Sequence, residues 1–266
     1  MAIVDQIAYQ DVHGIRVGRF RRKINTTCYV YAWRGNLIDA GPPNQWKFVR
    51  DFAACQHIKR VLITHHHEDH SGNASRLLNA GTPVHAPEMS VSPLRDGFPI
   101  EIYRRIVWGI PPRVTPLPFA GIPEENGLHP LLLPGHSNDM TCFLDRQNGR
   151  LFAGDLYISS RASHMRFDEN APQLLCSLDQ ILQSDFETVF CAHRGLVPGG
   201  KSAVQQKRDR LRSLQAKARE RQRQGDTEAE ITKRLLGRED LMSLMTFFHF
   251  SKRNLIRGLL LPDLKT

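Results

Sequence analysis

The amino-acid sequence predicts an α/β fold, and three observations support this prediction. In the first half of the chain, short apolar runs alternate with segments of helical periodicity, as in strand–helix–strand units. Strand-like runs return between residues 128 and 193, with one helical segment among them. After Gly200, charged residues become frequent and strand-like runs become rare. We therefore expect an α/β domain over residues 1–200 and a helical region over residues 201–266 that packs on it.

The first 90 residues give the clearest alternation of element types. A β-rich run ends at the turn "RGN", and a second short strand follows. The segment "WKFVRDFAACQHI" repeats apolar residues at helical spacing, and "RVLIT" after it is a short apolar strand. The expected order is strand 26–33, strand 37–39, a helix within 46–58, strand 60–64, helix 73–81 and strand 82–87.

The remainder of the chain mixes a loop, further strands and terminal helices. The segment "IEIYRRIVWGI" could form a helix, whereas five prolines within residues 110–123 indicate an ordered loop. A capping box at Thr227 and Glu230 and an N-cap at Ser251 mark the starts of two late helices. Strands are expected within 128–136, 140–146, 150–155 and 187–193, and helices within 173–182, 201–225, 226–237 and 251–260.

The composition restricts the classes of protein that the chain can represent. It has 266 residues, 41% hydrophobic and 24% charged, so it can bury a core without disulfides or a structural metal. Five cysteines without a Cys-x-x-Cys pair predict reduced thiols, and the start "MAIVDQIAYQ" lacks a secretory pattern, so we expect a cytoplasmic protein. No apolar run is as long as a membrane span, so no membrane association is expected.

The formal net charge of +9 is distributed unevenly, because much of it lies within residues 201–223. A basic helix can bind nucleic acid, but a charged helix face is more often simply solvated. An apolar stripe predicts that this helix packs on the domain and leaves its charges in water, so nucleic acid is not the expected partner. The stripe consists of Val204, Leu211, Leu214 and Ala218. No oligomeric state follows from these patterns.

The stretch "RVLITHHHEDHSGN", residues 60–73, concentrates imidazole and carboxylate groups directly after an apolar strand. Side chains alternate along a strand, so His65 and His67 should point to one side and His66 to the other. Asp69 and His70 follow at the start of the next helix and can turn back over the strand end. Imidazole nitrogen and carboxylate oxygen are ligands of zinc and related divalent metals. The stretch therefore predicts a metal site, and its number of donors suggests two ions.

Three further polar residues stand at the ends of apolar runs, as His65 does. They are His136 in "LLLPGHS", Asp155 in "LFAGDL" and His193 in "VFCAHRG". If these strand ends meet at one edge of a sheet, they complete a two-metal pocket.

In this order the four motifs resemble those of the metallo-β-lactamase superfamily, whose His-x-His-x-Asp-His motif is matched by His65 to His70. The resemblance covers roughly residues 25 to 200, and it implies an αββα sandwich with metals at one edge. It also implies the ligands: His65, His67 and His136 for the first metal, Asp69, His70 and His193 for the second, and Asp155 bridging both. His66 and Glu68 occupy variable positions of the motif.

The predicted chemistry is hydrolysis by a hydroxide that bridges two divalent ions, which we expect to be zinc, with iron or manganese as alternatives. Asp69 would both bind metal and orient this hydroxide. A small ester, thioester or lactone is the expected substrate, as in glyoxalase II-like and lactonase branches of the superfamily. The alternatives are an endoribonuclease, a β-lactamase and an iron-dependent sulfur dioxygenase. A binding protein without activity would be expected to lack one or more ligands, and none is missing.

Two segments are expected to shape the substrate site. The proline-rich segment 110–123, with Tyr103, Trp108 and Phe119 nearby, would form a wall or lid. The segment after Asp155 carries basic residues that could hold an anionic group of the substrate, although ion pairs with Asp168 or Glu169 would explain its arginines equally well. These candidate substrate residues are Arg161, His164 and Arg166.

Overall fold

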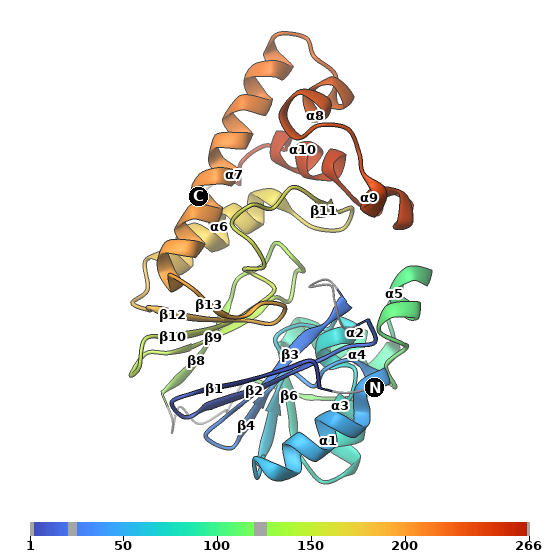
Figure 1. Ribbon diagram of the computed structural model, residues 1–266, viewed down its shortest axis with the longest axis vertical. Helices are drawn as coiled ribbons and strands as arrows, with labels where there is room; N and C mark the ends of the chain where they lie inside the picture. Colours follow the sequence, from blue (N-terminus) through green and yellow to red (C-terminus); the bar gives the residue numbers. More distant parts are fainter. Residues whose placement is uncertain (1–2, 21–25, 120–126, 265–266) are drawn as a thin grey trace. The chain divides into compact units, whose positions relative to one another are not determined.

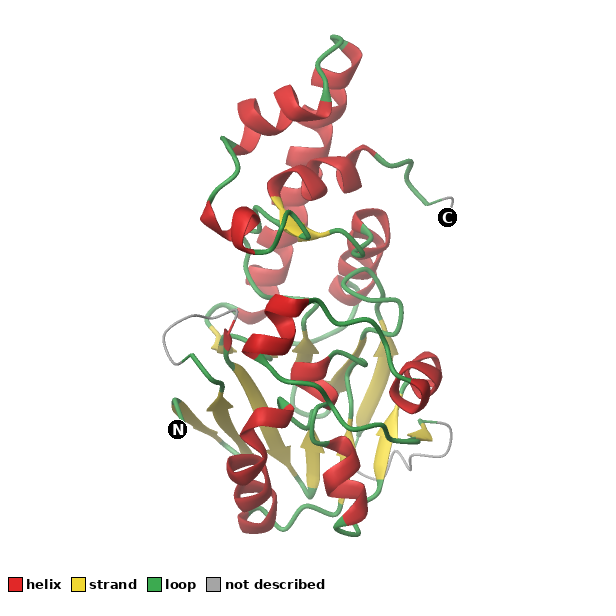
Figure 2. Cartoon of the chain, turned by 90° about the vertical axis from the view of Figure 1, so that its right-hand side faces the viewer, coloured by secondary structure: helices red, strands yellow, loops and turns green. Residues whose placement is uncertain are grey.

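The computed structural model describes residues 3–20, 26–119 and 127–264. The chain divides into two compact units: the strands of two large sheets belong to the first unit, and the second is mainly helical (Figures 1 and 2). The first unit comprises Met1–Leu132, Asp139–Asp155 and Phe186–Pro198, and the second Leu133–Asn138, Leu156–Asp185 and Gly199–Thr266. The expected domain division at residue 200 stays a prediction.

The first sheet contains, within the described residues, seven strands in chain order. They are β1 (Asp5–Tyr9), β2 (Val12–Val17), β3 (Cys28–Trp33), β4 (Asn36–Ile38), β5 (Arg60–Leu62), β6 (Val84–Ala86) and β7 (Leu117–Pro118). Strand β5 lies between β4 and β6 and runs parallel to both. Its apolar residues are buried, as expected for a strand covered on both faces. The residues that follow β5 therefore start from a fixed position.

The second sheet has the order β13-β12-β10-β9-β8 in the described part of the chain. Its strands are β8 (Leu128–Leu132), β9 (Thr141–Asp145), β10 (Arg150–Gly154), β12 (Thr188–Cys191) and β13 (Gly195–Val197). Strands β10 and β12 are parallel, and their register shifts between Phe152 and Gly154. Such an irregularity at a strand end can redirect the next side chain, which here is Asp155.

An aromatic core joins the two sheets of the first unit. Phe152 stacks on Phe190 at 5.0 Å between ring centroids, and Tyr31 of the first sheet contacts both rings. A second core covers the other face of the first sheet, where Val49 and Leu77 pack from helices. The helices of this unit are η2 (Pro43–Gln45), α1 (Trp46–Cys55), α2 (Glu68–Ser71), α3 (Ala74–Asn79), α4 (Glu88–Asp96) and α5 (Ile102–Val107).

The second unit is organised around a long charged helix, α7. Its stripe of Val204, Leu211, Leu214 and Ala218 is buried, and the expected packing of this stripe on the α/β domain stays a prediction. The capping box at Thr227 and Glu230 is formed, and the Ser251 side chain caps the last helix. The elements are β11 (Met165–Arg166), α6 (Ala171–Leu182), α7 (Gly200–Arg223), α8 (Glu228–Leu236), α9 (Leu241–Met245), β14 (Phe250–Ser251) and α10 (Lys252–Leu260).

The predicted α/β fold class is confirmed, but several elements were not foreseen from the sequence. The largest are the hairpin β1–β2 and helix α4, which contains Pro93. Part of the proline-rich segment, residues 120–123, lies outside the described residues. Before it, Phe119 packs edge-on against Phe143 in the aromatic core at 5.4 Å. Among the described helices, none combines the length and the apolar character that crossing a membrane requires.

Candidate metal centre

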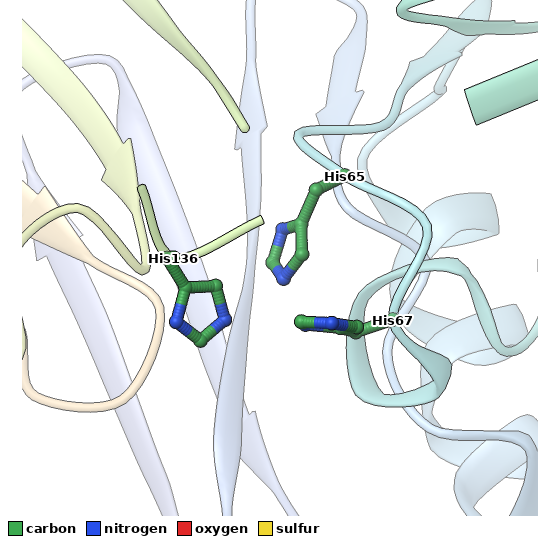
Figure 3. Close-up of side chains that lie close together, drawn as sticks. All are labelled: His65, His67 and His136. Atoms are coloured by element: carbon green, nitrogen blue, oxygen red, sulfur yellow. The ribbon is translucent and has the colours of Figure 1, made fainter. Parts of the chain in front are cut away.

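The loop between β5 and α2 carries the first two predicted ligands. The imidazole rings of His65 and His67 lie edge to face with centroids 4.4 Å apart, and both are buried (Figure 3). The Nδ1 atom of His65 is 3.0 Å from the hydroxyl of Thr64. Because this contact occupies Nδ1, the Nε2 atom is the one that remains for a metal.

Asp39, directly after β4, fixes the next part of the site. Its Oδ1 atom accepts hydrogen bonds from the backbone nitrogen of Thr64 at 2.8 Å and from the Thr64 hydroxyl at 2.9 Å. Its Oδ2 atom lies 2.7 Å from Nδ1 of His70. The backbone of Asp39 is left-handed, with φ of 63°, which is strained for a residue other than glycine. This carboxylate holds the His70 ring with Nε2 directed away from it.

The ring of His193 is also held through its Nδ1 atom, in this case by a backbone carbonyl. Its Nδ1 atom lies 2.8 Å from the carbonyl oxygen of Thr27, and since a carbonyl only accepts, Nδ1 must donate. Its Nε2 atom is then 3.3 Å from a carboxylate oxygen of Asp155 and 3.5 Å from one of Asp69. The Nε2 atom of His70 faces the same two carboxylates, at 3.5 Å from Asp155 and 3.7 Å from Asp69.

Two groups of ligand atoms within the first unit are close enough to hold metal ions. One consists of Asp69, His70 and His193, and the other of His65, His70 and Asp155. Within each group the ligand atoms lie within 4.8 Å of one another, and every residue is buried. The structure therefore brings together five of the predicted ligands, three imidazoles and two carboxylates.

The carboxylates also determine the protonation of the metal-free site. Burial lowers the pKa of His193, but the neighbouring carboxylates of Asp155 and Asp69 raise it more, to about 9. For His70, burial likewise lowers the pKa, and the charges of Asp39, Asp69 and Asp155 outweigh it, so the pKa lies well above its usual value. A metal ion that binds here must displace these protons.

Glycines precede both Asp155 and His136, and both have positive φ, which favours glycine. A Cβ atom on Gly135 would also lie 2.4 Å from the backbone of Leu174, whereas one on Gly154 would meet the terminal methyl group of Met140. Backbone conformation at both positions, and close packing at Gly135, therefore require glycine immediately before a predicted ligand.

His136 belongs to the second unit and is the third side chain drawn in Figure 3. Its Nδ1 atom lies 3.0 Å from a carboxylate oxygen of Glu169, which is in the same unit. The carboxylate orients this ring as Asp39 orients His70, and Nε2 is left as the ligand atom.

The variable positions of the motif, His66 and Glu68, have structural partners. The ring of His66 is 2.8 Å from Asp139 and packs edge-on against Phe98. Glu68 is fully buried and forms an ion pair with the buried Arg104 of α5, with 2.8 Å between Arg104 Nε and Glu68 Oε1. This pair ties helix α2, which carries Asp69 and His70, to helix α5.

Helix α5 brings an aromatic ring to the site. Trp108, directly after the helix, is buried, and its ring centroid is 6.3 Å from that of His193. The side chain of Asn44 donates to the carbonyl of Val107 at 2.8 Å and so holds this end of the helix. Of the three aromatic residues expected in the wall, Trp108 therefore contacts a predicted metal ligand, whereas Phe119 packs in the core.

The three candidate substrate residues all lie in the second unit. Arg161 is exposed. His164 is 3.1 Å from Asp240 and stacks on Phe250, and Arg166 pairs with Asp168 at 2.9 Å. Their role in substrate binding stays a prediction.

The donor set of the first unit fits divalent metal ions. Imidazoles whose Nδ1 atoms are engaged from behind, together with carboxylates, are typical ligands of zinc and related metals. The buried Nε2 atom of His70 has no hydrogen-bond partner within the described residues, although two carboxylates lie nearby. A metal ion in front of this nitrogen would satisfy it.

A model of the metallo-beta-lactamase superfamily matches residues 26–193, which is more than half of the chain. This chain belongs to that superfamily. The solved structures agree on the fold of this metallo-beta-lactamase superfamily member. A beta-lactamase domain protein from Burkholderia ambifaria covers 97% of the chain with a TM-score of 0.67 at 19% identity, and 88% of that protein is matched. A family protein from Thermus thermophilus covers 95% with a TM-score of 0.64 at 18% identity, with 91% of that protein matched.

Two curated relatives are enzymes of acyl-group hydrolysis by name. A hydroxyacylglutathione hydrolase of Shewanella halifaxensis is 33% identical over 139 residues, which is 50% of this chain and 46% of that protein. An atrochrysone carboxyl ACP thioesterase of Aspergillus fumigatus is 25% identical over 228 residues, 76% of this chain and 64% of that protein. The chain thus spans about half the length of the hydroxyacylglutathione hydrolases that it matches.

Sequence reasoning missed Asp39, Arg104 and the individual role of Trp108. A signal for Asp39 was present, because "LIDAG" ends an apolar run with an acidic residue, as "LFAGD" does. No comparable signal marks Arg104, whose partner Glu68 is 36 residues away.

Proposed function

We propose that this chain is a metal-dependent hydrolase that uses two divalent ions, zinc in the first place, to cleave a small thioester or related acyl ester. The observation that carries the proposal is the orientation of His70 and His193. Each Nδ1 atom is engaged from behind, by Asp39 and by Thr27, and each Nε2 atom faces the same two carboxylates. Such an arrangement positions ligands before the metal binds.

The proposed ligand set is the one implied by the family motifs. His65, His67 and His136 would hold one ion, Asp69, His70 and His193 the other, and Asp155 would bind both. Support for Asp155 as the shared ligand comes from its position facing both His70 and His193, at 3.5 Å and 3.3 Å. Support for His136 comes from Glu169, which orients its ring for binding through Nε2.

When bound, two divalent ions supply a water of lowered pKa and polarise the carbonyl that it attacks. Asp69 would accept a hydrogen bond from the attacking water and so orient it, because its carboxylate lies within 3.7 Å of Nε2 of His70 and 3.5 Å of Nε2 of His193. Trp108 gives the site an apolar wall beside His193 and keeps bulk water away from that side. The buried pair of Glu68 and Arg104 keeps helix α5, and with it this wall, in place.

The proposed substrate class follows from the relatives. One is named a hydrolase of hydroxyacylglutathione and another a thioesterase, and an acyl group on the glutathione thiol is a thioester. The apolar ring of Trp108 beside the site would also accommodate the acyl part of such a substrate. We therefore propose a small acyl thioester, with simple esters and lactones as chemically related substrates.

The test is an activity panel on the purified protein before and after chelation. A thioester, a lactone, a phosphodiester and a β-lactam are offered at equal concentration, and metal content is measured in the same samples. We expect turnover of the thioester to be highest, to vanish on chelation and to return with zinc. If the protein cleaves the phosphodiester or the β-lactam faster than the thioester, the proposed substrate class is wrong. Thioester cleavage that survives complete metal removal would overturn the proposal.

A further inference from the structure

Lys207 is a buried lysine that the proposed mechanism does not use. Within α7, all of whose residues the structure describes, Lys207 is the one buried residue that carries a charge. Its side chain lies in the same stripe as Val204 and Leu211. Burial of an ammonium group is unfavourable unless hydrogen bonds compensate for the lost hydration. A lysine in this apolar stripe therefore needs a specific partner.

The partner is a backbone carbonyl next to the metal centre. The Nζ atom of Lys207 donates to the carbonyl oxygen of Leu156 at 2.6 Å, and both residues belong to the second unit. Leu156 is fully buried and directly follows Asp155 in the chain. On the other side of Asp155, the carbonyl of Gly154 accepts from the backbone nitrogen of Ala192 at 3.2 Å. The two chain neighbours of Asp155 are thus each anchored through a carbonyl, Gly154 by the residue that follows β12 and Leu156 by Lys207.

We propose that Lys207 is a positioning residue of the metal centre, which holds the chain after Asp155 so that this carboxylate can reach both ions. The inference rests on the proposed role of Asp155 as the shared ligand. It gives the charged helix α7 a function in the site, beyond covering apolar surface. Lys207 acts through the Leu156 carbonyl and touches neither the substrate nor the metal.

A second lysine of the same helix provides a matched control. The Nζ atom of Lys201 donates to the carbonyl oxygen of Ser184 at 2.7 Å. The bond is of the same kind and of similar length, although Lys201 is only half-buried, and Ser184 is not next to a predicted ligand. A purely structural role of Lys207 would therefore make its replacement resemble that of Lys201.

The experiment compares Lys207→Met, Lys207→Gln and Lys201→Met with the wild type. Metal stoichiometry and affinity are measured by equilibrium dialysis against buffered zinc, and the melting temperature is measured on chelator-treated protein. We expect Lys207→Met to lose one equivalent, or to bind it about tenfold more weakly or worse. Lys207→Gln, which keeps an N–H donor, should recover part of this loss, and Lys201→Met should bind metal as the wild type does.

Wild-type stoichiometry and affinity in Lys207→Met would overturn the inference while the proposed function stands. If that variant does not fold, Lys207→Gln decides by the same measurement, since unaltered zinc affinity in it would overturn the inference equally. A wild-type protein that binds no zinc would overturn the proposed function, and this inference with it, so the two failures are distinguishable.

Discussion

Two stretches of the chain carry predicted site residues, and they differ in how firmly their side chains are held. In the stretch from His65 to His70, the four predicted ligands are each 7% exposed or less, and His70 is oriented by Asp39. In the stretch from Arg161 to Asp168, Arg161 is exposed, Arg166 pairs with its neighbour Asp168, and His164 pairs with Asp240. The ligands of the first stretch are held by burial, and the polar residues of the second by ion pairs.

The difference shows where sequence patterns carry information about chemistry. Burying imidazoles and carboxylates is costly unless each has a partner, so a run of them after a buried strand implies a common ligand. An arginine at the surface costs little free energy of folding, and a surface ion pair between neighbours contributes about 0–1 kcal/mol. The presence of arginines in a sequence is therefore weak evidence for a binding site. Changes at the buried ligands and their partners should therefore have large effects, and changes at the arginines of the second stretch small ones.

The largest effect is expected from Asp155→Ala. If this carboxylate is shared by both ions, its loss removes one metal equivalent and lowers turnover about a thousandfold, which corresponds to about 4 kcal/mol in the activation barrier. Metal content and steady-state kinetics measure both quantities. Asp185→Ala, at an exposed position, serves as the control. Two bound ions in the Asp155 variant would remove Asp155 from the ligand set.

A second large effect concerns pH. The raised pKa of His193, about 9, means that the metal-free protein gains stability from this residue below about pH 6.5 and loses it as the pH rises through 9. Metal binding displaces the proton, so zinc affinity should rise at least about tenfold per pH unit between pH 7 and 9. The measurement is the melting temperature with and without buffered zinc across this range. If the difference in melting temperature between the zinc-loaded and the metal-free protein stays constant with pH, the predicted displacement of a proton is wrong.

Replacing Asp39 tests whether the contact at Nδ1 of His70 contributes to zinc affinity. Asp39→Asn keeps the size of the side chain but removes the charge facing Nδ1 of His70, so zinc affinity should fall about 10- to 100-fold. Competition with a chromophoric chelator gives the affinity. Asp51→Asn, at an exposed position of α1, is the control. Equal affinity in the two variants would show that His70 needs no orientation from Asp39.

The smallest effect is expected in the second stretch. If Arg161 and Arg166 attract an anionic substrate, their joint replacement with alanine should raise KM by several-fold, roughly, and leave kcat nearly unchanged. As a control, Arg95→Ala removes a more exposed ion pair, with Asp96, away from this stretch. Kinetics identical to those of the Arg95 variant would assign both arginines a structural role, and Trp108 would then remain as the group that selects substrates.

The sequence predicted the fold class and a motif for each proposed ligand because both depend on local patterns. Strand β5 and the histidines after it are adjacent in the chain, so one stretch contains the element and its polar end. Long-range partners are less visible: Arg104 is recognisable as a site residue only once it meets Glu68. Helix α4 forms in spite of Pro93, with Ser90 and Leu94 buried, and strand β2 is recognised through its pairing with β3. In each case tertiary contacts decide against a weak local signal.

If the ligands after β5, β10 and β12, together with His136, hold two metal ions, the zinc content of the wild-type protein should show it. The zinc content is measured after equilibration with buffered zinc and removal of excess. We expect two equivalents per chain, with hydrolytic activity that rises as they bind. A protein that retains less than one equivalent, yet is folded and active, would contradict this expectation.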